Sequence, residues 1–298
     1  MTTEAPLLRA RKVTRAFGGV TAVDVDELEV PAGAIVALIG PNGAGKTTFF
    51  NVLTGFERAN GGEWSFDGKD LTGRPAYAVA RAGMVRTFQT ARVFPRLSVL
   101  ENVKLAAPDQ RGERMFTALF PWRWRAQDRE IEARATELIE WVGLGPKRLD
   151  YAGTLSGGQR KLLELARAVM ASPRLLMLDE PMAGVNPALR QALLDKITEL
   201  PGEGITVLFV EHDMDVVSAI SDIVVCMAEG KVIATGTPAE VAAEPAVVEA
   251  YLGRSHEDLR SVHPGGLDPT GEFDDAGVGD ADAGDVGSAG TEGGGTDG

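Results

Sequence analysis

Cysteine and long apolar runs are scarce in this sequence of 298 residues. Its one cysteine, Cys226, excludes an intramolecular disulfide bond and favours a reducing compartment. The longest apolar runs, Ile35–Ile39 and Ile223–Met227, have the length of strands, whereas a membrane helix needs roughly 18 apolar residues. The start, Met1–Glu4, lacks the basic and apolar segments of a secretory signal. We therefore expect a cytoplasmic chain that does not itself span a membrane.

Basic side chains are fewer than acidic ones, and most of the acidic excess lies at one end of the chain. Residues 254–298 carry eleven acidic side chains and two arginines, which is −9 of the formal net charge of −13. This segment is rich in glycine and aspartate and has few large apolar side chains, so it cannot offset the entropy of ordering. We predict a disordered acidic tail over residues 254–298 and a folded domain over residues 1–253. The folded part lacks the basic surface of a duplex-binding protein, so no nucleic acid partner is expected.

Strand and helix patterns alternate along the folded part. Four short apolar runs have the composition of buried strands: Ala34–Ile39, Leu175–Leu178, Ile205–Val210 and Ile223–Met227. Helical patterns lie at Lys46–Leu53 and at Pro187–Leu200. In the second of these, four apolar residues share one face: Leu189, Leu193, Leu194 and Ile197. This alternation predicts an α/β fold with a mostly parallel sheet wrapped by helices.

Residues 93–161 differ from the rest because they contain almost no strand pattern. Apolar residues at helical spacing form a stripe within them: Ile131, Ala135, Leu138, Ile139 and Val142. We predict an α-helical subdomain over about residues 93–161, inserted into the α/β core.

A glycine-rich loop joins the first predicted strand to the helix that begins at Lys46. It has the pattern G-x-x-x-x-G-K-[ST] and consists of Gly40, Pro41, Asn42, Gly43, Ala44, Gly45, Lys46 and Thr47. Such a loop turns its backbone N–H groups toward phosphate oxygens at a helix N-terminus. Lys46 would reach the β- and γ-phosphates, and the Thr47 hydroxyl would bind Mg²⁺. An incidental glycine-rich turn is the alternative, but the strand before the loop and the helix after it favour a nucleoside triphosphate site.

Two carboxylates end the predicted strand at Leu175–Leu178. Asp179 is placed to bind Mg²⁺, as the second acidic element of such ATPases does. If the chain stays extended, the Glu180 side chain points the other way and can approach the attacking water. A positioned base contributes roughly 10²–10⁴-fold to the rate, so Glu180→Gln should keep ATP binding and lose turnover.

A second helix N-terminus begins at Ser156. Leu155-Ser156-Gly157-Gly158-Gln159 precedes a helical run, Arg160–Met170, and Ser156 is a typical N-cap residue. Its serine and glycine N–H groups form another phosphate cradle. A single ATP would leave this cradle unused unless it met the nucleotide bound to another subunit.

These segments together resemble the nucleotide-binding subunit of ABC transporters. Gly40–Thr48 resembles Walker A, Leu155–Gln159 is identical to the LSGGQ signature, and Leu175–Glu180 resembles Walker B. The resemblance covers about Leu7–Gly253 and extends the loop contacts to Thr48. It implies a P-loop ATPase core with an N-terminal antiparallel β subdomain and an inserted helical subdomain. It also implies a dimer in which ATP and Mg²⁺ lie between Walker A of one subunit and the signature of the other.

Three further residues match this family in register. Phe17 is similar to the aromatic residue that stacks on adenine. Gln89, at the end of Arg86–Gln89, resembles the Q-loop glutamine that touches Mg²⁺ or water. His212 resembles the switch histidine at the γ-phosphate. Asn186 stands where many members have an aspartate, which leaves the strength of coupling between the two sites open.

Three sequence details narrow the resemblance to the LivG type, the larger ATPase of branched-chain amino acid importers. They are Arg86–Gln89, Ala183–Pro187 and Glu211–Met214. The type implies a second ATPase subunit (identical or different), two membrane-spanning permease subunits, a solute-binding protein and a peripheral place on the cytoplasmic face of the membrane. The extra stretch at about Pro108–Trp124, with Trp122 and Trp124, either lies near the permeases and lipid headgroups or packs on the adjacent helix.

Other classes explain less of the sequence. A soluble P-loop kinase or GTPase would leave Leu155–Gln159 and His212 unaccounted for. A non-transport ABC protein usually has two cassettes or a long coiled coil, and the sequence shows neither. The ATPase of an exporter, such as one that extracts lipopolysaccharide, is the nearest alternative. The sequence does not define the solute, because the solute contacts other chains.

Overall fold

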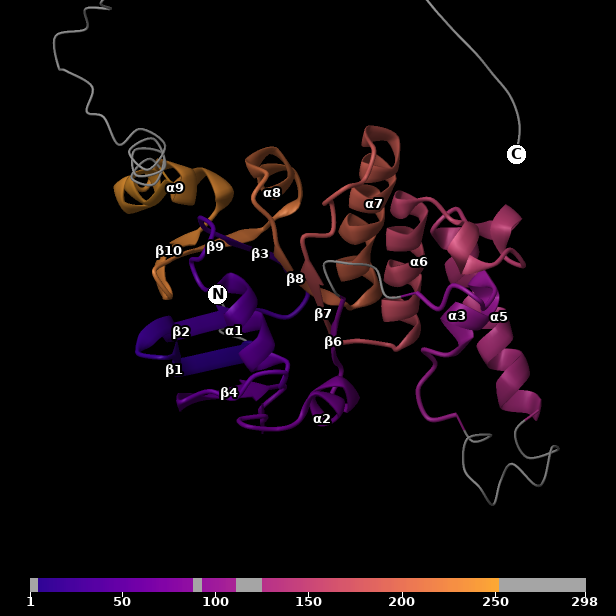
Figure 1. Cartoon of the computed structure of the whole chain (residues 1–298), viewed down its shortest axis with the longest axis horizontal. Helices are drawn as coiled ribbons and strands as arrows, with labels where there is room; N and C mark the ends of the chain where they lie inside the picture. The colour runs from indigo at the N-terminus through magenta and orange to yellow at the C-terminus, as the bar shows by residue number, and fades with distance from the viewer. Residues whose placement is uncertain (1–4, 88–92, 111–124, 252–298) are drawn as a thin grey trace, which may run out of the picture. The chain divides into compact units, whose positions relative to one another are not determined.

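The computed structural model describes residues 5–87, 93–110 and 125–251 (Figure 1). The chain divides into two units, residues 1–256 and 257–298, and all described residues lie in the first. The acidic tail, Gln89, Trp122 and Trp124 lie outside the described residues. Within the described ranges, no helix is both long and apolar enough to cross a membrane.

The larger sheet has six strands, and five of them run parallel. Its order is β10-β9-β3-β8-β7-β6. The strands are β3 (Ile35–Ile39), β6 (Met84–Arg86), β7 (Leu175–Asp179), β8 (Thr206–Val210), β9 (Ile223–Ala228) and the antiparallel edge strand β10 (Lys231–Gly236). Every residue of β3, β7 and β8 is buried, because both faces of the sheet are covered. The four predicted buried strands are confirmed.

A second, antiparallel sheet has the order β2-β1-β4-β5 and confirms the expected N-terminal β subdomain. Its strands are β1 (Leu8–Phe17), β2 (Val20–Val30), β4 (Gly61–Phe66) and β5 (Lys69–Asp70). Strands β1 and β2 are joined at Gly18 and Gly19, which both have positive φ. Paired positive φ values suit a two-residue hairpin turn, and glycine adopts them without strain. The turn leaves Phe17 at the exposed tip of the hairpin.

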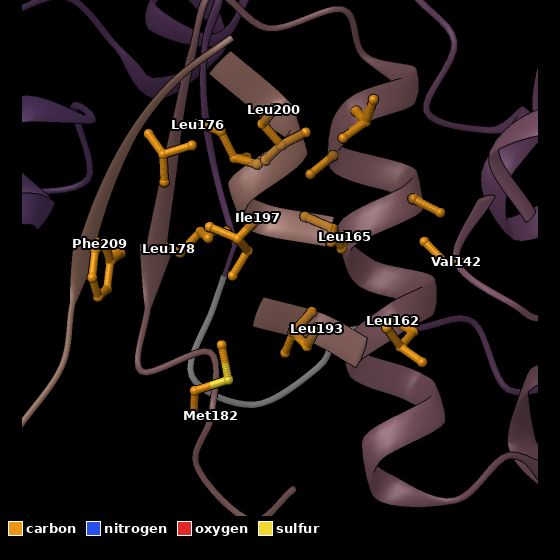
Figure 2. Close-up of a cluster of buried hydrophobic side chains, with 14 of the residues drawn as sticks. Val142, Leu162, Leu165, Leu176, Leu178, Met182, Leu193, Ile197, Leu200 and Phe209 are labelled. Carbon is orange, nitrogen blue, oxygen red and sulfur yellow. The ribbon is translucent and has the colours of Figure 1, made fainter. Parts of the chain in front are cut away.

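The helices pack against the sheets in two separate clusters of buried apolar side chains. α1 (Lys46–Leu53) packs Phe49 and Phe50 into a cluster that also contains Trp64 and Phe66 of the second sheet. α6 (Gly157–Met170) and α7 (Pro187–Glu199) pack on β7 and β8 in the other cluster (Figure 2). The predicted face of α7 is confirmed, since Leu193 and Ile197 are buried and Leu189 and Leu194 pack against the same core. The remaining elements here are α2 (Ala76–Arg81), η5 (Leu200–Glu203), α8 (Met214–Ile220) and α9 (Pro238–Ala243).

Between β6 and β7 the regular elements of the described residues are helices, together with one isolated bridge between Ser98 and Tyr151. The elements are α3 (Val99–Lys104), α5 (Arg125–Trp141), η3 (Gly145–Lys147), η4 (Ala152–Thr154) and α6. The predicted stripe faces the core: Ala135 and Ile139 of α5 and Val142 just after it are buried, and Ile131 and Leu138 pack against the same core cluster. The limits of this subdomain stay a prediction, as do those of the tail.

Candidate functional site

The carboxyl ends of four neighbouring parallel strands bring most of the predicted site residues to one edge of the sheet. The glycine-rich loop follows β3, His212 comes just after β8, Asp179 ends β7 and Arg86 ends β6. The strand ends are in register, because Leu38 pairs with Val210 and Val210 pairs with Asp179. Ligands of open α/β sheets bind outside this edge.

The glycine-rich loop is pressed against neighbouring backbone at two points. A Cβ on Gly40, where φ is 144°, would lie 2.0 Å from the Met227 carbonyl oxygen. A Cβ on Gly45, where φ is 97°, would lie 2.2 Å from the Ala22 carbonyl oxygen. Only glycine fits at both positions in this conformation of the loop.

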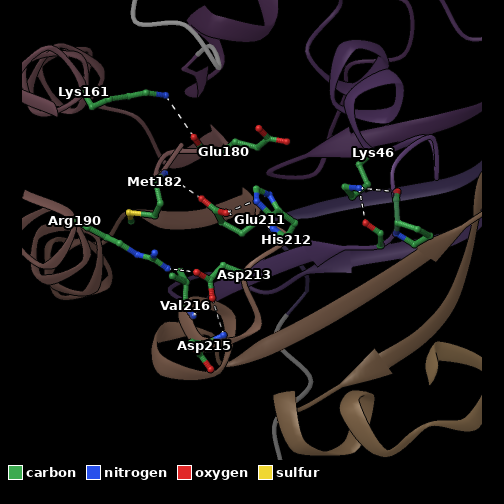
Figure 3. A network of polar contacts seen from close by, with 12 residues as sticks. Lys46, Lys161, Glu180, Met182, Arg190, Glu211, His212, Asp213, Asp215 and Val216 are labelled. Carbon is green, nitrogen blue, oxygen red and sulfur yellow. Dashed lines mark hydrogen bonds and ion pairs between the residues drawn. The ribbon is translucent and has the colours of Figure 1, made fainter. Parts of the chain in front are cut away.

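The N-terminus of α1 is open to a ligand. Gly45 is its N-cap residue, and no side chain caps it. Lys46 folds back over the loop, where its Nζ donates to the carbonyl oxygens of Gly40 at 2.6 Å and Pro41 at 3.0 Å (Figure 3). Thr47 is exposed and Thr48 is half-buried beside it. The loop therefore presents an ammonium group, a hydroxyl and helix N–H groups together. These are the groups that bind a polyphosphate.

Asp179, the predicted metal ligand, forms a buried ion pair that sequence reasoning missed. The Arg86 Nη2 donates to its Oδ2 at 2.7 Å, and the two side chains are only 6% and 8% exposed. Arg86 also donates to Asn51 Oδ1 on α1 at 2.6 Å. The arginine thus connects the helix of the glycine-rich loop to the strand that ends in Asp179. The sequence gives no local signal for this pair, because it joins two strands that are far apart along the chain.

Glu180 does not lie in an extended segment, so that prediction was wrong. Its φ is 46°, in the left-handed region, and its N–H donates to the Val210 carbonyl oxygen at 3.0 Å. The chain turns here because the next residues leave the sheet for α7. Lys161 of α6 donates to the Glu180 carbonyl oxygen at 3.4 Å, and the Glu180 carboxylate points away from Lys161 (Figure 3).

His212 is exposed, whereas the side chains of its two neighbours, Glu211 and Asp213, contact the segment after β7. Its side chain is 66% exposed, whereas that of Glu211 is 2% exposed. Burial raises the pKa of the Glu211 carboxyl, which accepts the Met182 N–H at 3.0 Å. On the other side Asp213 forms an ion pair with Arg190 (Figure 3). Neither flanking pair was expected from the sequence.

The signature segment caps its own helix. Ser156 Oγ accepts the Gln159 N–H at 3.3 Å, and Gln159 Oε1 accepts the Ser156 N–H at 3.0 Å. Ser156 and Gly157 are exposed, and Gly158 is buried against Leu189. The tip of α6 packs against α7 through Gly158 and Leu189, and the buried residues of α6 and α1 belong to different core clusters.

The predicted base-stacking residue is accessible. Phe17 is 44% exposed, and the Arg15 guanidinium carbon lies 4.2 Å from the centre of its ring. No cluster of three or more His, Cys, Asp or Glu side chains that could hold a metal occurs among the described residues. Mg²⁺ fits this donor set through nucleotide phosphates, because it is usually held by substrate phosphates and one or two protein ligands. Thr47 and Asp179 are of that kind.

Comparison with known proteins places this site in a family. The family model described as "ABC transporter" matches residues 23–183. The chain therefore belongs to the ABC transporter family, as an ATP-binding and ATP-hydrolysing subunit. A second model, "Branched-chain amino acid ATP-binding cassette transporter", matches residues 231–257.

Individual relatives agree over nearly their whole length. The chain is 41% identical over 253 residues to the probable branched-chain amino acid transport ATP-binding protein LivG of Archaeoglobus fulgidus, covering 85% of this chain and 98% of that protein. It is 42% identical over 252 residues to the high-affinity branched-chain amino acid transport ATP-binding protein BraF of Pseudomonas aeruginosa, covering 84% and 99%.

Solved structures give the same fold. A nucleotide-free ATP-binding cassette from an ABC transporter superposes with a TM-score of 0.71 at 36% identity, over 83% of this chain and 98% of that one. The ADP conformation of MJ1267, an ATP-binding cassette of an ABC transporter, gives a TM-score of 0.72 at 37% identity, over 84% and 100%. The predicted fold class is confirmed.

Proposed function

We propose that this chain powers the import of branched-chain amino acids, or of a related small polar solute, by hydrolysing ATP. The observation that carries the proposal is the C-terminal match over residues 231–257, together with 41–42% identity to LivG and BraF over 98–99% of their length. The C-terminal match favours an importer over an exporter, because it describes branched-chain amino acid cassettes.

The proposed nucleotide pocket is built from the loop after β3. Phe17 stacks on the base, and the loop Gly40–Thr48 wraps the phosphates with its N–H groups. Lys46 exchanges its two carbonyl partners, 2.6 and 3.0 Å away, for the β- and γ-phosphates. Gln89, outside the described residues, completes this pocket near the metal and water. Phosphate is a stronger acceptor for an ammonium group than a neutral carbonyl, so the exchange is favourable.

The proposed hydrolysis uses residues after β7 and β8. Mg²⁺, when bound with ATP, would neutralise phosphate charge, and Thr47, Asp179 and Gln89 would hold it. Arg86 fixes the Asp179 carboxylate at 2.7 Å, so one of its oxygens stays oriented by the protein. Glu180 orients and deprotonates the attacking water, and His212 contacts the γ-phosphate. Arg86 holds the Asp179 carboxylate, whereas the Glu180 carboxylate points away from Lys161 of α6, which supports two different roles (Figure 3).

The proposed pocket is shared between two subunits. Ser156, Gly157, Gly158 and Gln159 would meet the γ-phosphate that the other subunit holds. The exposure of Ser156 and Gly157 supports this, since both are accessible to another subunit. The second ATPase is another copy or a different chain. The dimer would drive two membrane-spanning permeases, fed by a solute-binding protein, from the cytoplasmic face of the membrane.

Glu180→Gln tests the proposal in the transporter purified through a tag on this chain. We expect ATP binding within twofold of the unaltered protein and turnover reduced by roughly 10²–10⁴-fold, because only the base is removed. Glu203→Gln, at an exposed position of η5, is the matched control and should keep full turnover. Vesicles containing the transporter should take up labelled leucine, isoleucine and valine only with ATP. Full turnover of Glu180→Gln would contradict the mechanism, and uptake of none of the three would contradict the solute class.

A further inference from the structure

The two acidic residues that flank His212 both hold the chain segment that follows β7. Glu211 Oε1 accepts the Met182 N–H at 3.0 Å, and its other oxygen accepts the His212 N–H at 3.4 Å. Asp213 forms its ion pair with Arg190 in the first turns of α7. Figure 3 shows both connections on either side of His212. The loop of His212 is therefore tied twice to residues 182–190.

The Glu211 carboxylate is closed off from solvent. Its side chain is 2% exposed, and its carboxylate is used on two backbone N–H groups. A carboxylate buried at this depth is costly unless it is hydrogen-bonded, so the bond to Met182 is needed wherever Glu211 stays ionised. Glu211 therefore contacts the Met182 and His212 backbone, and its Oε2 also lies 3.9 Å from Nδ1 of the His212 ring.

The segment 182–190 also touches the tip of the signature helix. A Cβ on Gly158 would lie 2.6 Å from Leu189 Cδ1 and 3.3 Å from Val185 Cγ1, so this segment packs directly over the glycine. Asn186 caps α7 between those two contacts by accepting the Leu189 N–H at 2.9 Å. Contacts therefore run without a gap from Gly158, through Val185 and Leu189, to Met182 and Glu211.

We propose that Glu211 is a positioning residue that couples the tip of α6 to His212 of the same chain. The proposal rests on the proposed function, in which the α6 tip meets the other subunit's nucleotide and His212 meets the chain's own. A shift of residues 182–190 when the α6 tip engages one site moves the Met182 N–H, and Glu211 passes that movement to His212 at the second site. Each chain then links the two shared sites of the dimer.

A kinetic cycle in the purified transporter tests the coupling. Glu211→Gln keeps an oxygen for Met182 but turns an amide toward the His212 N–H, and we expect kcat to fall about tenfold with KM for ATP unchanged within twofold. Asn186→Ala should lower kcat as well, and the double variant should be no slower than Glu211→Gln alone, because both act on one connection. Asp195→Asn, exposed on α7, is the control and should leave kcat unchanged. Multiplicative losses, or a normal kcat for Glu211→Gln, would overturn the coupling.

The proposed function fails by a different result. Normal turnover of His212→Ala would remove His212 from the reaction. Conversely, a loss in His212→Ala together with a normal Glu211→Gln would leave the proposed function intact and overturn the coupling alone.

A second measurement does not depend on turnover. The chain has three histidines, so labelled histidine gives a simple NMR spectrum of the full-length protein, in which His212→Gln assigns the His212 ring signal. Asn186→Ala should shift that signal in the unaltered background and leave it unmoved in Glu211→Gln. If Glu211→Gln does not fold, Glu211→Asp, whose shorter side chain withdraws the carboxylate from the Met182 N–H, should at least halve the shift. An equal shift in every background would refute the proposal.

Discussion

The two helix N-termini of the proposed site, those of α1 and α6, are built in opposite ways. α1 begins after a left-handed glycine, Gly45, and has no side-chain cap. α6 begins at Ser156, which exchanges two hydrogen bonds with Gln159 in a capping box. The first N–H groups of a helix have no partner within the helix. Because α1 has no side-chain cap, its N-terminus can take a ligand, whereas α6 satisfies part of its end with its own side chains.

This difference suits the two helix ends to different roles: α1 to binding the subunit's own nucleotide, and α6 to contacting the nucleotide of the other subunit. The uncapped α1 end can donate its N–H groups to phosphate oxygens, which suits the ATP proposed for the subunit's own loop. The α6 end keeps its shape in a lone subunit and presents Ser156 and Gly157 at the surface. Substitutions at the two ends should therefore give different losses.

Lys46→Ala should have the largest effect on binding. Hydrogen bonds to charged groups contribute about 1.5–3 kcal/mol, so ATP affinity of the isolated chain should fall about 10- to 150-fold. Ser156→Ala should leave that affinity within twofold and cost about 1 kcal/mol of stability through the lost cap. Titration with a fluorescent ATP analogue and thermal unfolding measure the two. Equal loss of affinity in both variants would break the comparison.

Gly45→Ala and Gly157→Ala should differ in stability. Alanine at position 45 meets the Ala22 carbonyl and a φ of 97°, so we expect unfolding to become easier by about 1–3 kcal/mol. Position 157 has open space around it, and the free energy of unfolding should stay within about 0.5 kcal/mol. Turnover of the Gly157→Ala transporter should nevertheless fall, because the added methyl group faces the other subunit's nucleotide. Denaturant unfolding together with ATPase assays checks both, and full turnover would count against the shared pocket.

Gln159→Glu should test the neutral cap of α6. The caps of α3 and α9 use Glu101 and Glu240, so a carboxylate can make the same bonds. A negative charge there would repel the other subunit's phosphates by about 1 kcal/mol, and we expect kcat/KM to fall about fivefold. The loss should shrink as salt rises. A loss that ignores ionic strength would show that charge is not the cause.

The smallest effect is the pH dependence of these caps. The Ser98 N–H and hydroxyl lower the pKa of Glu101, and Thr237 lowers that of Glu240 in the same way, in both cases from 4.5. Each cap therefore stabilises fully above pH 4.5, and its contribution is lost as the pH falls through the lowered pKa. The cap of α6 has no such dependence, whereas Gln159→Glu should introduce one. Carbon NMR titration of the carboxylates would measure the midpoints, and a midpoint above 4.5 would contradict this account.

The sequence predicts the parallel core well, because buried strands are continuous apolar runs and the loops that follow them carry the chemistry. The sequence predicts the site less well where contacts between distant segments determine how the side chains are placed. Arg86 and Asp179 meet across β6 and β7, and no local pattern indicates that ion pair. Glu180 looks extended from its neighbours, yet the exit toward α7 forces a turn there. β6 is too short, at three residues, to give a strand signal.

The N-terminal sheet shows a different limit. β1 and β2 alternate buried and exposed residues, and charged side chains occupy their exposed face, so their apolar signal is weak. The family resemblance, and not the residue pattern, predicted this subdomain.

The contacts of the glycine-rich loop determine when it can fold during synthesis of the chain. The loop is held by residues far later in the chain: Gly40 lies against the Met227 carbonyl, and the Gly230 N–H donates to the Ala44 carbonyl at 3.0 Å. While the chain is still on the ribosome, the loop emerges long before β9 and the turn after it. A nascent chain that ends before Met227 lacks the backbone groups against which the loop packs. The capacity to bind ATP therefore arises only near the end of translation.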